Sequence, residues 1–228
     1  MAETTVMALL AGYGAAQRLV HRMVVFCLGA LLVAAPAQAA GPLIWALGDS
    51  LTAGYGLPPA DGFTRQLELA LRQAGVPATV RNGGISGDTT RQGRARLLWG
   101  LRGLEAKPDL VIVELGANDM LRGLPPEQAR ANLDLILAEL DRRHIRVLIA
   151  GMRASPNLGP DYVREFDAIY PALAQKYRAR LYPFFLDGVA GKRALIQADG
   201  LHPNAQGVRI IVGRLLPSVR QALAIRPK

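Results

Sequence analysis

Hydrophobic and polar positions follow two different periods along this chain. Short continuous apolar runs, typical of strands buried on both faces, alternate with stretches in which apolar residues recur every three or four positions. The run Leu110–Leu115 is the clearest strand, and Leu133, Ile136 and Leu137 mark the clearest helical face. Strands that alternate with helices in this way favour parallel strands joined by crossover helices.

The pattern predicts five strands, which are Leu43–Leu47, Ala78–Arg81, Leu110–Leu115, Arg146–Ala150 and a short one near Leu181–Pro183. It predicts helices at Phe63–Ala74, Thr90–Leu104, Pro126–Arg142, Asp161–Tyr177 and Ala205–Leu223. Thr89 and Gln92 are spaced as in a capping box, at the start of the second helix. The predicted fold is α/β, a doubly wound sheet of about five parallel strands with helices on both faces.

The first 39 residues have the features of an export signal. Arg18 and Arg22 precede the uncharged, apolar segment Met23–Ala35, and Ala37-Gln38-Ala39 is a small-x-small cleavage pattern. We predict a signal peptide at residues 1–39, a single domain at 40–228 and a periplasmic or secreted protein. The start codon is left open. The alternative is an uncleaved membrane anchor, although the apolar segment is shorter than the roughly 20 residues that span a bilayer.

Cysteine usage narrows the chemistry. The single cysteine, Cys27, lies within the predicted signal peptide. The mature chain therefore has no thiol for a disulfide, a cysteine nucleophile or a thiolate metal site, which leaves serine as the natural nucleophile.

The charge balance bears on partners. Lys and Arg total 27 and Asp and Glu total 18, so the net charge is +9. A surface of this kind attracts anions, and we expect transient contact with anionic membrane surfaces. The arginines are spread along the chain without an aromatic-basic strip or a nucleic-acid motif, so no nucleic-acid partner is predicted.

The candidate site residues follow the predicted strands, at the edge of the sheet where ligands bind. Ser50 follows the first strand, Gly87 the second and Asn118 the third, and Asp199 and His202 lie before the last helix. Each motif also has a structural interpretation. Asp-Ser after a strand is typical of a helix cap. The glycine-rich segment 82–89 is typical of a flexible turn between a strand and a helix, with Asp88 or Thr89 as the N-cap of that helix. Gly-Ala-Asn-Asp at 116–119 is typical of a polar turn.

Taken together, these residues supply the parts of a serine hydrolase. Asp199 and His202 are close enough to share one turn, so the carboxylate can bond one imidazole nitrogen while the other faces Ser50. The N–H of Gly87 and the side-chain amide of Asn118 are candidate oxyanion donors. The mature chain has only two histidines, and His144 is expected at a solvated helix end, so neither a zinc site nor any other metal site is predicted.

The four blocks around Ser50, Gly87, Asn118 and His202 resemble the SGNH (GDSL) hydrolases. The resemblance covers nearly all of residues 41–223 and is closest to the bacterial periplasmic acyl-CoA thioesterase/lysophospholipase/arylesterase subgroup. It extends to Ile85-Ser86-Gly87-Asp88-Thr89, Val113-Glu114-Leu115-Gly116, Ala168-Ile169-Tyr170-Pro171 and Pro183-Phe184-Phe185. It implies a flavodoxin-like fold, a Ser50–His202–Asp199 triad, an oxyanion hole that includes Gly87 and Asn118, and no metal or cofactor.

The function that this resemblance implies is an exported serine esterase. It is expected to act as a monomer on lysophospholipids, aryl esters and, in vitro, acyl-CoA. Two alternatives remain open, a carbohydrate O-deacetylase on the same fold and a non-catalytic exported binding protein. One departure concerns substrate choice, because Ala154 and Ser155 replace the Leu-Pro pair that lines the acyl site of the best-known members. This loss of apolar wall predicts a preference for short or aryl esters.

Overall fold

A computed structural model describes residues 41–224 of the chain. At the centre of this part lies a five-stranded, all-parallel sheet in the order β2-β1-β3-β4-β5. The strands are β1 (Leu43–Gly48), β2 (Thr79–Gly84), β3 (Leu110–Glu114), β4 (Arg146–Ala150) and β5 (Arg180–Tyr182). The predicted doubly wound fold is therefore confirmed. The predicted signal peptide, with His21 and Cys27, lies outside the described residues.

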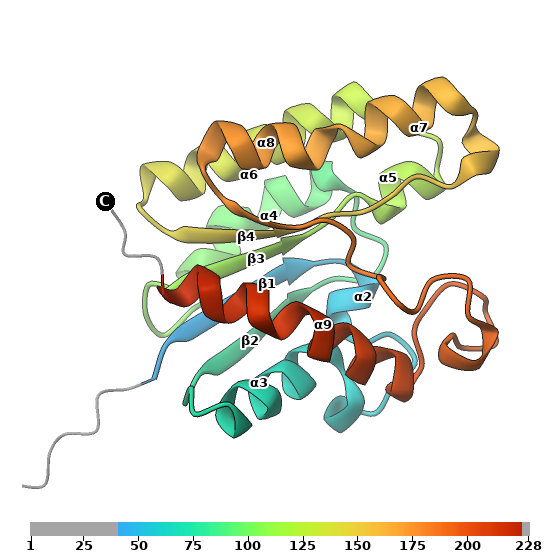
Figure 1. Ribbon diagram of the computed structural model, residues 1–228. Helices are drawn as coiled ribbons and strands as arrows, with labels where there is room; N and C mark the ends of the chain where they lie inside the picture. The colour runs from blue at the N-terminus through green and yellow to red at the C-terminus, as the bar shows by residue number, and fades with distance from the viewer. Residues whose placement is uncertain (1–40, 225–228) are drawn as a thin grey trace, which may run out of the picture. The chain divides into compact units, whose positions relative to one another are not determined.

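Helices cover both faces of this sheet (Figure 1). The long helices α3 and α9 lie on one face, and α4, α6 and α8 lie on the other. The α-helices are α2 (Ser50–Ala53), α3 (Phe63–Gln73), α4 (Thr90–Arg102), α5 (Ala117–Leu121), α6 (Pro126–Arg142), α7 (Pro160–Asp167), α8 (Ile169–Tyr177) and α9 (Ala205–Ala224). Three short 3-10 turns are η1 (Pro59–Asp61), η2 (Pro156–Leu158) and η3 (Arg193–Leu195). Within residues 41–224, no helix has the length and apolar character needed to cross a membrane.

The two central strands are buried along their whole length. Every residue of β1 and of β3 is buried, as expected for strands that are covered on both faces. β1 pairs with β2 on one side and with β3 on the other, with Leu47 opposite both Gly83 and Val113. This pairing brings the carboxyl ends of three strands to one edge of the sheet.

The strand order places a switch point between β1 and β3. The chain leaves β1 for β2 on one side, and from β2 it crosses to β3 on the other side, so the following connections diverge. In a doubly wound sheet of this order, ligands bind in the crevice outside the carboxyl ends of these two strands. Ser50 follows β1 and Asn118 lies in α5, directly after β3. The fold therefore brings these two predicted site residues to the crevice.

Two sequence-based expectations differ from the structure. The helix predicted at Asp161–Tyr177 is two helices, α7 and α8, which meet at Ala168. Pro171 has no N–H to donate to the carbonyl four residues earlier, and its ring crowds that carbonyl, so the helix breaks there. The short helices α2 and α5 were not predicted, since each is too short to show a helical period.

The glycines of segment 82–89 serve different purposes. Gly83 and Gly84 belong to β2, where a Cβ would lie 2.2 Å from Nε1 of Trp45 and 2.3 Å from the backbone N of Ala53, respectively. They permit close packing within the chain. Gly87 alone of the three lines the pocket around Ser50, with a φ of 85° that favours glycine.

Candidate active site

Ser50 is the first residue of α2, immediately beyond the end of β1. Asp49 caps this helix, because its Oδ1 accepts the N–H of Leu51 at 3.0 Å. Gly48 allows the tight turn, since a Cβ there would lie 2.0 Å from Oγ1 of Thr52. The helix-cap interpretation of Asp-Ser therefore holds for Asp49. Because the cap starts α2 at Ser50, it also fixes the position of the Ser50 side chain at the edge of the sheet.

Ser50, His202 and Asp199 form a continuous hydrogen-bonded relay. Oγ of Ser50 lies 2.8 Å from Nε2 of His202, and Nδ1 of His202 lies 2.7 Å from Oδ2 of Asp199. The two ring nitrogens thus face different partners, as a base oriented by a carboxylate requires. The structure brings these three predicted residues together across 152 positions of sequence between Ser50 and His202.

Asp199 is held in its charged form. Its Oδ1 accepts the backbone N–H groups of Leu201 at 2.9 Å and of His202 at 3.0 Å. These two bonds, with the side chain of His202, lower the pKa of Asp199 to about 2. The carboxylate therefore remains ionised at any pH near neutrality and can stabilise a proton on the imidazole.

The loop that carries His202 is tied to the segment after α2 by contacts that sequence analysis missed. The ring of Tyr55 lies 4.6 Å from the ring of His202, with a 36° angle between their planes. Nε2 of Gln197 donates to the carbonyl of Tyr55 at 2.8 Å and to the carbonyl of Pro203 at 3.0 Å. Gln197 therefore links the segment after Ser50 to the loop that carries the base.

The predicted oxyanion donors lie in the same pocket as Ser50. Gly87 and Asn118 both line it, together with Ser50 and His202. Nδ2 of Asn118 donates to Oδ2 of Asp49 at 3.0 Å and to the carbonyl of Asp88 at 3.1 Å. Both amide hydrogens thus have acceptors, so an oxyanion must displace or share one of them.

Two arginines hold the loop between β2 and α4, and neither was identified from the sequence. A guanidinium nitrogen of Arg122 donates to the carbonyl of Gly87 at 2.7 Å. Nε of Arg96 lies 2.5 Å from Oδ2 of Asp88, and the same guanidinium donates to the carbonyl of Gly48 at 2.8 Å. Asp88 is thus an ion-pair partner, while Thr89 is the N-cap of α4 and forms the predicted capping box with Gln92.

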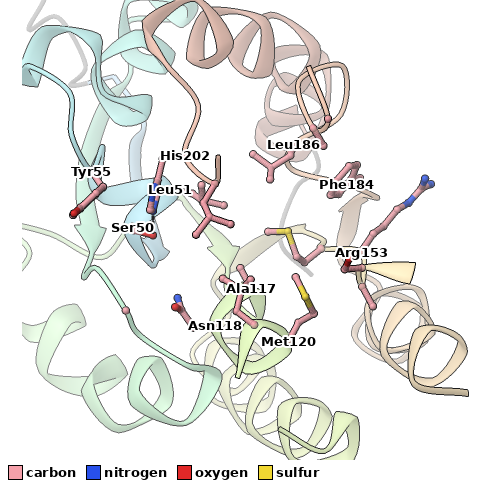
Figure 2. A pocket seen from close by; sticks show the side chains of 18 of the residues that line it. Ser50, Leu51, Tyr55, Ala117, Asn118, Met120, Arg153, Phe184, Leu186 and His202 are labelled. Atoms are coloured by element: carbon pink, nitrogen blue, oxygen red, sulfur yellow. Dashed lines mark hydrogen bonds between the residues drawn. The ribbon is translucent and has the colours of Figure 1, made fainter. Parts of the chain in front are cut away.

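A largely apolar pocket of about 700 Å³ extends from the relay. Figure 2 shows Ser50, Tyr55 and His202 at one end, and Phe184 and Arg153 at the other. The apolar part of the wall consists mainly of Leu51, Ala117, Met120, Leu121, Met152, Phe184 and Leu186. The segment 152–156 also lines it, as expected for the loop that follows β4. A hydrophobic chain attached to a carbonyl group at Ser50 fits such a space.

Two buried carboxyl groups lie beneath the nucleophile. Asp49 and Glu114 are both fully buried, and Oε2 of Glu114 accepts a hydrogen bond from Oγ1 of Thr52 at 2.8 Å. Burial raises the pKa of Asp49 to about 6. Burial, followed by the nearby charge of Asp49, raises the pKa of Glu114 well above its usual range. Burial therefore favours the protonated form of Glu114 in the folded protein.

The sign of this shift predicts a pH-dependent effect of Glu114→Gln. A carboxyl group with a raised folded-state pKa stabilises the fold fully at low pH, and that stabilisation is lost as pH rises through the raised value. The wild-type protein should therefore lose stability relative to Glu114→Gln between pH 5 and 9. We expect the difference in melting temperature to change by at least about 2 °C in favour of the variant, measured by calorimetry.

Glu139→Gln is the matched control for this experiment. Arg142 and Arg143 lower the pKa of Glu139 to about 2, so that carboxylate is ionised at both pH values. Its replacement should shift the melting temperature equally at pH 5 and pH 9. The burial argument would be contradicted if the difference in melting temperature between Glu114→Gln and the wild type were also the same at pH 5 and pH 9.

Within residues 41–224, no group of three or more His, Cys, Asp and Glu side chains is arranged to hold a metal ion. The metal-free and cofactor-free chemistry expected from the sequence stays a prediction.

Comparisons with known proteins agree with this geometry. Residues 46–210 match the GDSL-like Lipase/Acylhydrolase family. The chain is 41% identical over 189 residues to an arylesterase of Vibrio mimicus, which covers 83% of this chain and 90% of the relative. It is 39% identical over 166 residues to "Thioesterase 1/protease 1/lysophospholipase L1" of Escherichia coli K12, which covers 73% of this chain and 77% of the relative.

Solved structures extend the comparison to three dimensions. The crystal structure of AlinE4, an esterase of the SGNH-hydrolase family, is 51% identical in sequence and superposes with a TM-score of 0.70. The match covers 83% of this chain and all of the other. Sequence, fold and pocket therefore point to the same family.

Proposed function

The chain belongs to the GDSL-like lipase/acylhydrolase family, and we propose that it hydrolyses acyl esters and thioesters through an acyl-Ser50 intermediate. It is a hydrolase that acts on ester bonds, as its esterase and thioesterase relatives are named. The observation that carries the mechanism is the Ser50–His202–Asp199 relay at one end of an apolar pocket.

In the first half of the proposed reaction, Oγ of Ser50 attacks the acyl carbonyl carbon while Nε2 of His202 takes the hydroxyl proton. Asp199 holds the ring in the tautomer that leaves Nε2 free and stabilises the imidazolium that forms. When the tetrahedral intermediate collapses, His202 returns the proton to the departing alcohol or thiol. In the second half, His202 takes a proton from water while the water oxygen attacks the acyl carbonyl carbon. The bond to Oγ then breaks, His202 returns the proton to Ser50, and the carboxylic acid leaves.

The negative oxygen of each tetrahedral intermediate needs donors on the opposite side from His202. We assign this role to the backbone N–H groups of Ser50 and Gly87 and to the amide of Asn118. The hydrogen bond from Arg122 to the Gly87 carbonyl supports the assignment, because it fixes the orientation of the glycine-containing loop. Gly87 and Asn118 line the same pocket as Ser50, which also supports it.

The pocket favours a hydrophobic acyl group over the acetyl group of a carbohydrate ester. Its wall is mostly apolar over about 700 Å³, which is far more room than an acetyl group fills. The signal-peptide pattern of residues 1–39 supports export to the periplasm or beyond. Because acyl-CoA is a cytosolic metabolite, we propose a lipid ester such as a lysophospholipid as the physiological substrate.

A substrate panel tests this function. Purified protein should hydrolyse p-nitrophenyl esters, lysophosphatidylcholine and acyl-CoA, and should show little activity on acetylated sugars. Higher kcat/KM on acetylated sugars than on medium-chain esters would favour the O-deacetylase instead. No turnover of any ester would favour a binding protein.

The loop that follows β4 should set the acyl-length preference. Ala154 and Ser155 line the pocket, and the φ of −71° at Ser155 suits proline. Each methylene of an acyl chain contributes about 0.8 kcal/mol when fully buried, so added apolar wall should favour longer chains. The double variant Ala154→Leu/Ser155→Pro should steepen the dependence of kcat/KM on acyl length, measured with p-nitrophenyl esters from C4 to C12.

Asn157→Leu is the matched control for the loop variant. Asn157 lies in the same loop but does not line the pocket. This variant adds apolar bulk without altering the wall, so its length profile should match the wild type. A folded, active double variant with an unchanged profile would show that this loop does not select the acyl chain.

A further inference from the structure

The exposed hydrophobic side chains of the described residues are not evenly distributed. Seven large ones are exposed, namely Tyr55, Ile85, Leu98, Trp99, Leu121, Leu135 and Leu201. Tyr55, Leu121 and Leu201 line the pocket that contains Ser50, and Ile85 adjoins Ser86, which also lines it. We call these four residues the rim, since each lines the pocket or adjoins a residue that lines it.

The rim is assembled from separate parts of the chain. Tyr55 follows α2, Ile85 follows β2, Leu121 ends α5 and Leu201 precedes α9. The exposure of these side chains ranges from 46% to 54%. Single exposed hydrophobic residues are ordinary on protein surfaces, whereas a group around one cavity indicates an interaction site.

The charges near the rim are asymmetric. In the loops at the carboxyl edge of the sheet, the acidic side chains of Asp49 and Asp119 are buried. Four other acidic groups there lie within 4 Å of a basic group, namely Asp61 with Arg209, Asp88 with Arg96, Asp187 with Arg214 and Asp199 with His202. Asp167 instead accepts the backbone N–H of Ala154 at 2.8 Å. The basic residues of the same loops include Arg122, Arg153, Lys192 and Arg193, and none of these four forms an ion pair with another residue of the described range 41–224.

Three of these basic residues line the pocket or adjoin a lining residue in sequence. Arg153 lines it, with its guanidinium carbon 5.5 Å from the ring centre of Phe184, and Figure 2 shows this side chain at the end away from Ser50. Arg122 follows Leu121 in sequence, and Lys192 follows Gly191, another lining residue. Around the pocket, exposed hydrophobic side chains therefore lie near basic side chains that form no ion pair within residues 41–224.

We propose that the rim and these four basic residues form a docking surface for anionic lipid membranes. Hydrophobic side chains that enter the interfacial region and basic side chains that meet anionic head groups are the two contributions to such binding. In this orientation the pocket entrance faces the lipid layer, and a lipid ester can pass from the membrane to Ser50 without crossing water. The proposal rests on the lipid-ester function for its purpose, but the binding itself does not require catalysis.

Vesicle binding by the Ser50→Ala protein tests the docking surface without lipid hydrolysis. Vesicles of equal parts phosphatidylglycerol and phosphatidylcholine should bind the protein, and vesicles of phosphatidylcholine alone should bind it much more weakly, as measured by flotation. Leu121→Ser and Leu201→Ser should each weaken binding to the anionic vesicles about tenfold. Lys192→Gln and Arg193→Gln should each weaken this binding about fivefold. Added salt should also weaken it, because salt screens the attraction between basic side chains and anionic head groups.

Trp99→Ser and Leu135→Ser are the matched controls. Both residues are exposed, Trp99 at 71% and Leu135 at 48%, but they lie on α4 and α6 and do not line the pocket. These variants should bind vesicles within twofold of the parent. Absence of binding to anionic vesicles would overturn the proposal. Equal losses of vesicle binding in the rim and control variants would also overturn it and would indicate nonspecific adsorption.

The two proposals can fail separately. Vesicle binding in a protein that hydrolyses no ester would contradict the proposed function and leave the docking surface supported. Ester hydrolysis by a protein that ignores anionic vesicles would contradict the docking surface alone.

Discussion

Replacing Ser50 by alanine should lower kcat/KM by about four orders of magnitude or more. Oγ of Ser50 is the atom that meets Nε2 of His202, and no neighbouring hydroxyl holds that position in the relay. The fold should be unaffected, because Ser50 is a small residue in the first turn of α2 and alanine is a good helix former. Steady-state hydrolysis of a p-nitrophenyl ester and a melting curve measure the two expectations.

Ser86→Ala is the matched control for the nucleophile. Ser86 also lines the pocket, but the structure gives its hydroxyl no hydrogen bond to His202. This variant should keep most of the wild-type activity. If Ser50→Ala kept as much as about a tenth of wild-type activity, the hydroxyl of Ser50 could not be the nucleophile.

Asn118→Ala should lower kcat by about a hundredfold or more and raise KM by much less, since an oxyanion donor acts in the transition state. Nδ2 of Asn118 also bridges Asp49 and the carbonyl of Asp88, so the variant loses two structural hydrogen bonds as well. Some loss of melting temperature should accompany the kinetic defect. Steady-state kinetics and thermal unfolding of the same sample separate the two effects.

Asn132→Ala supplies the comparison that isolates the kinetic role. Asn132 is a second buried asparagine, on α6, and it does not line the pocket. Its Nδ2 donates to the carbonyl of Gln128 at 2.9 Å and to Oγ1 of Thr90 at 3.4 Å, and its Oδ1 accepts from Arg94 at 3.1 Å. Its replacement should lower the melting temperature while kcat stays near the wild-type value. A defect confined to KM in Asn118→Ala would instead identify a group that binds the substrate's ground state.

Much of the fold was predictable because the sheet is buried on both faces. Continuous apolar runs such as Leu110–Leu115 stand out from the amphipathic helices, and all five strands were identified with shifts of a few residues at their ends. Because the carboxyl ends of parallel strands meet at one edge, the positions of Ser50 and Asn118 followed from the strand assignment. The bonds among Ser50, His202 and Asp199 agree with the proposed triad, whose catalytic role stays a prediction.

The missing part of the site consists of contacts between loops. Gln197 donates to the carbonyl of Tyr55 across 142 positions, and Arg122 donates to the carbonyl of Gly87 across 35. Such contacts depend on where loops lie in the folded chain, and no local period or spacing encodes them. The break between α7 and α8 is different, because Pro171 is a local signal that the sequence does contain. A single helix was predicted there because the apolar residues recur at helical spacing through the proline.

The burial of Glu114 was also beyond a reading of the sequence. A glutamate at the end of an apolar run usually marks the point where a strand meets solvent. Here the packing of Thr52 and Gly48 covers it, and a Cβ on Gly48 would lie 2.7 Å from its Oε2. The carboxyl pair under the nucleophile is therefore a product of tertiary packing between β1, α2 and β3.

Covalent labelling with a fluorophosphonate tests the central claim most directly, because this reagent reacts with serines that a neighbouring base activates. Between Arg22 and Arg65 the chain has a single serine, Ser50, and no lysine or other arginine, so the tryptic peptide that ends at Arg65 reports on it alone. We predict one adduct per chain on this peptide, found by mass spectrometry, with parallel loss of esterase activity and no labelling of Ser50→Ala. An adduct on another peptide would contradict the account. So would a protein that carries no adduct and keeps full esterase activity after exposure to the reagent.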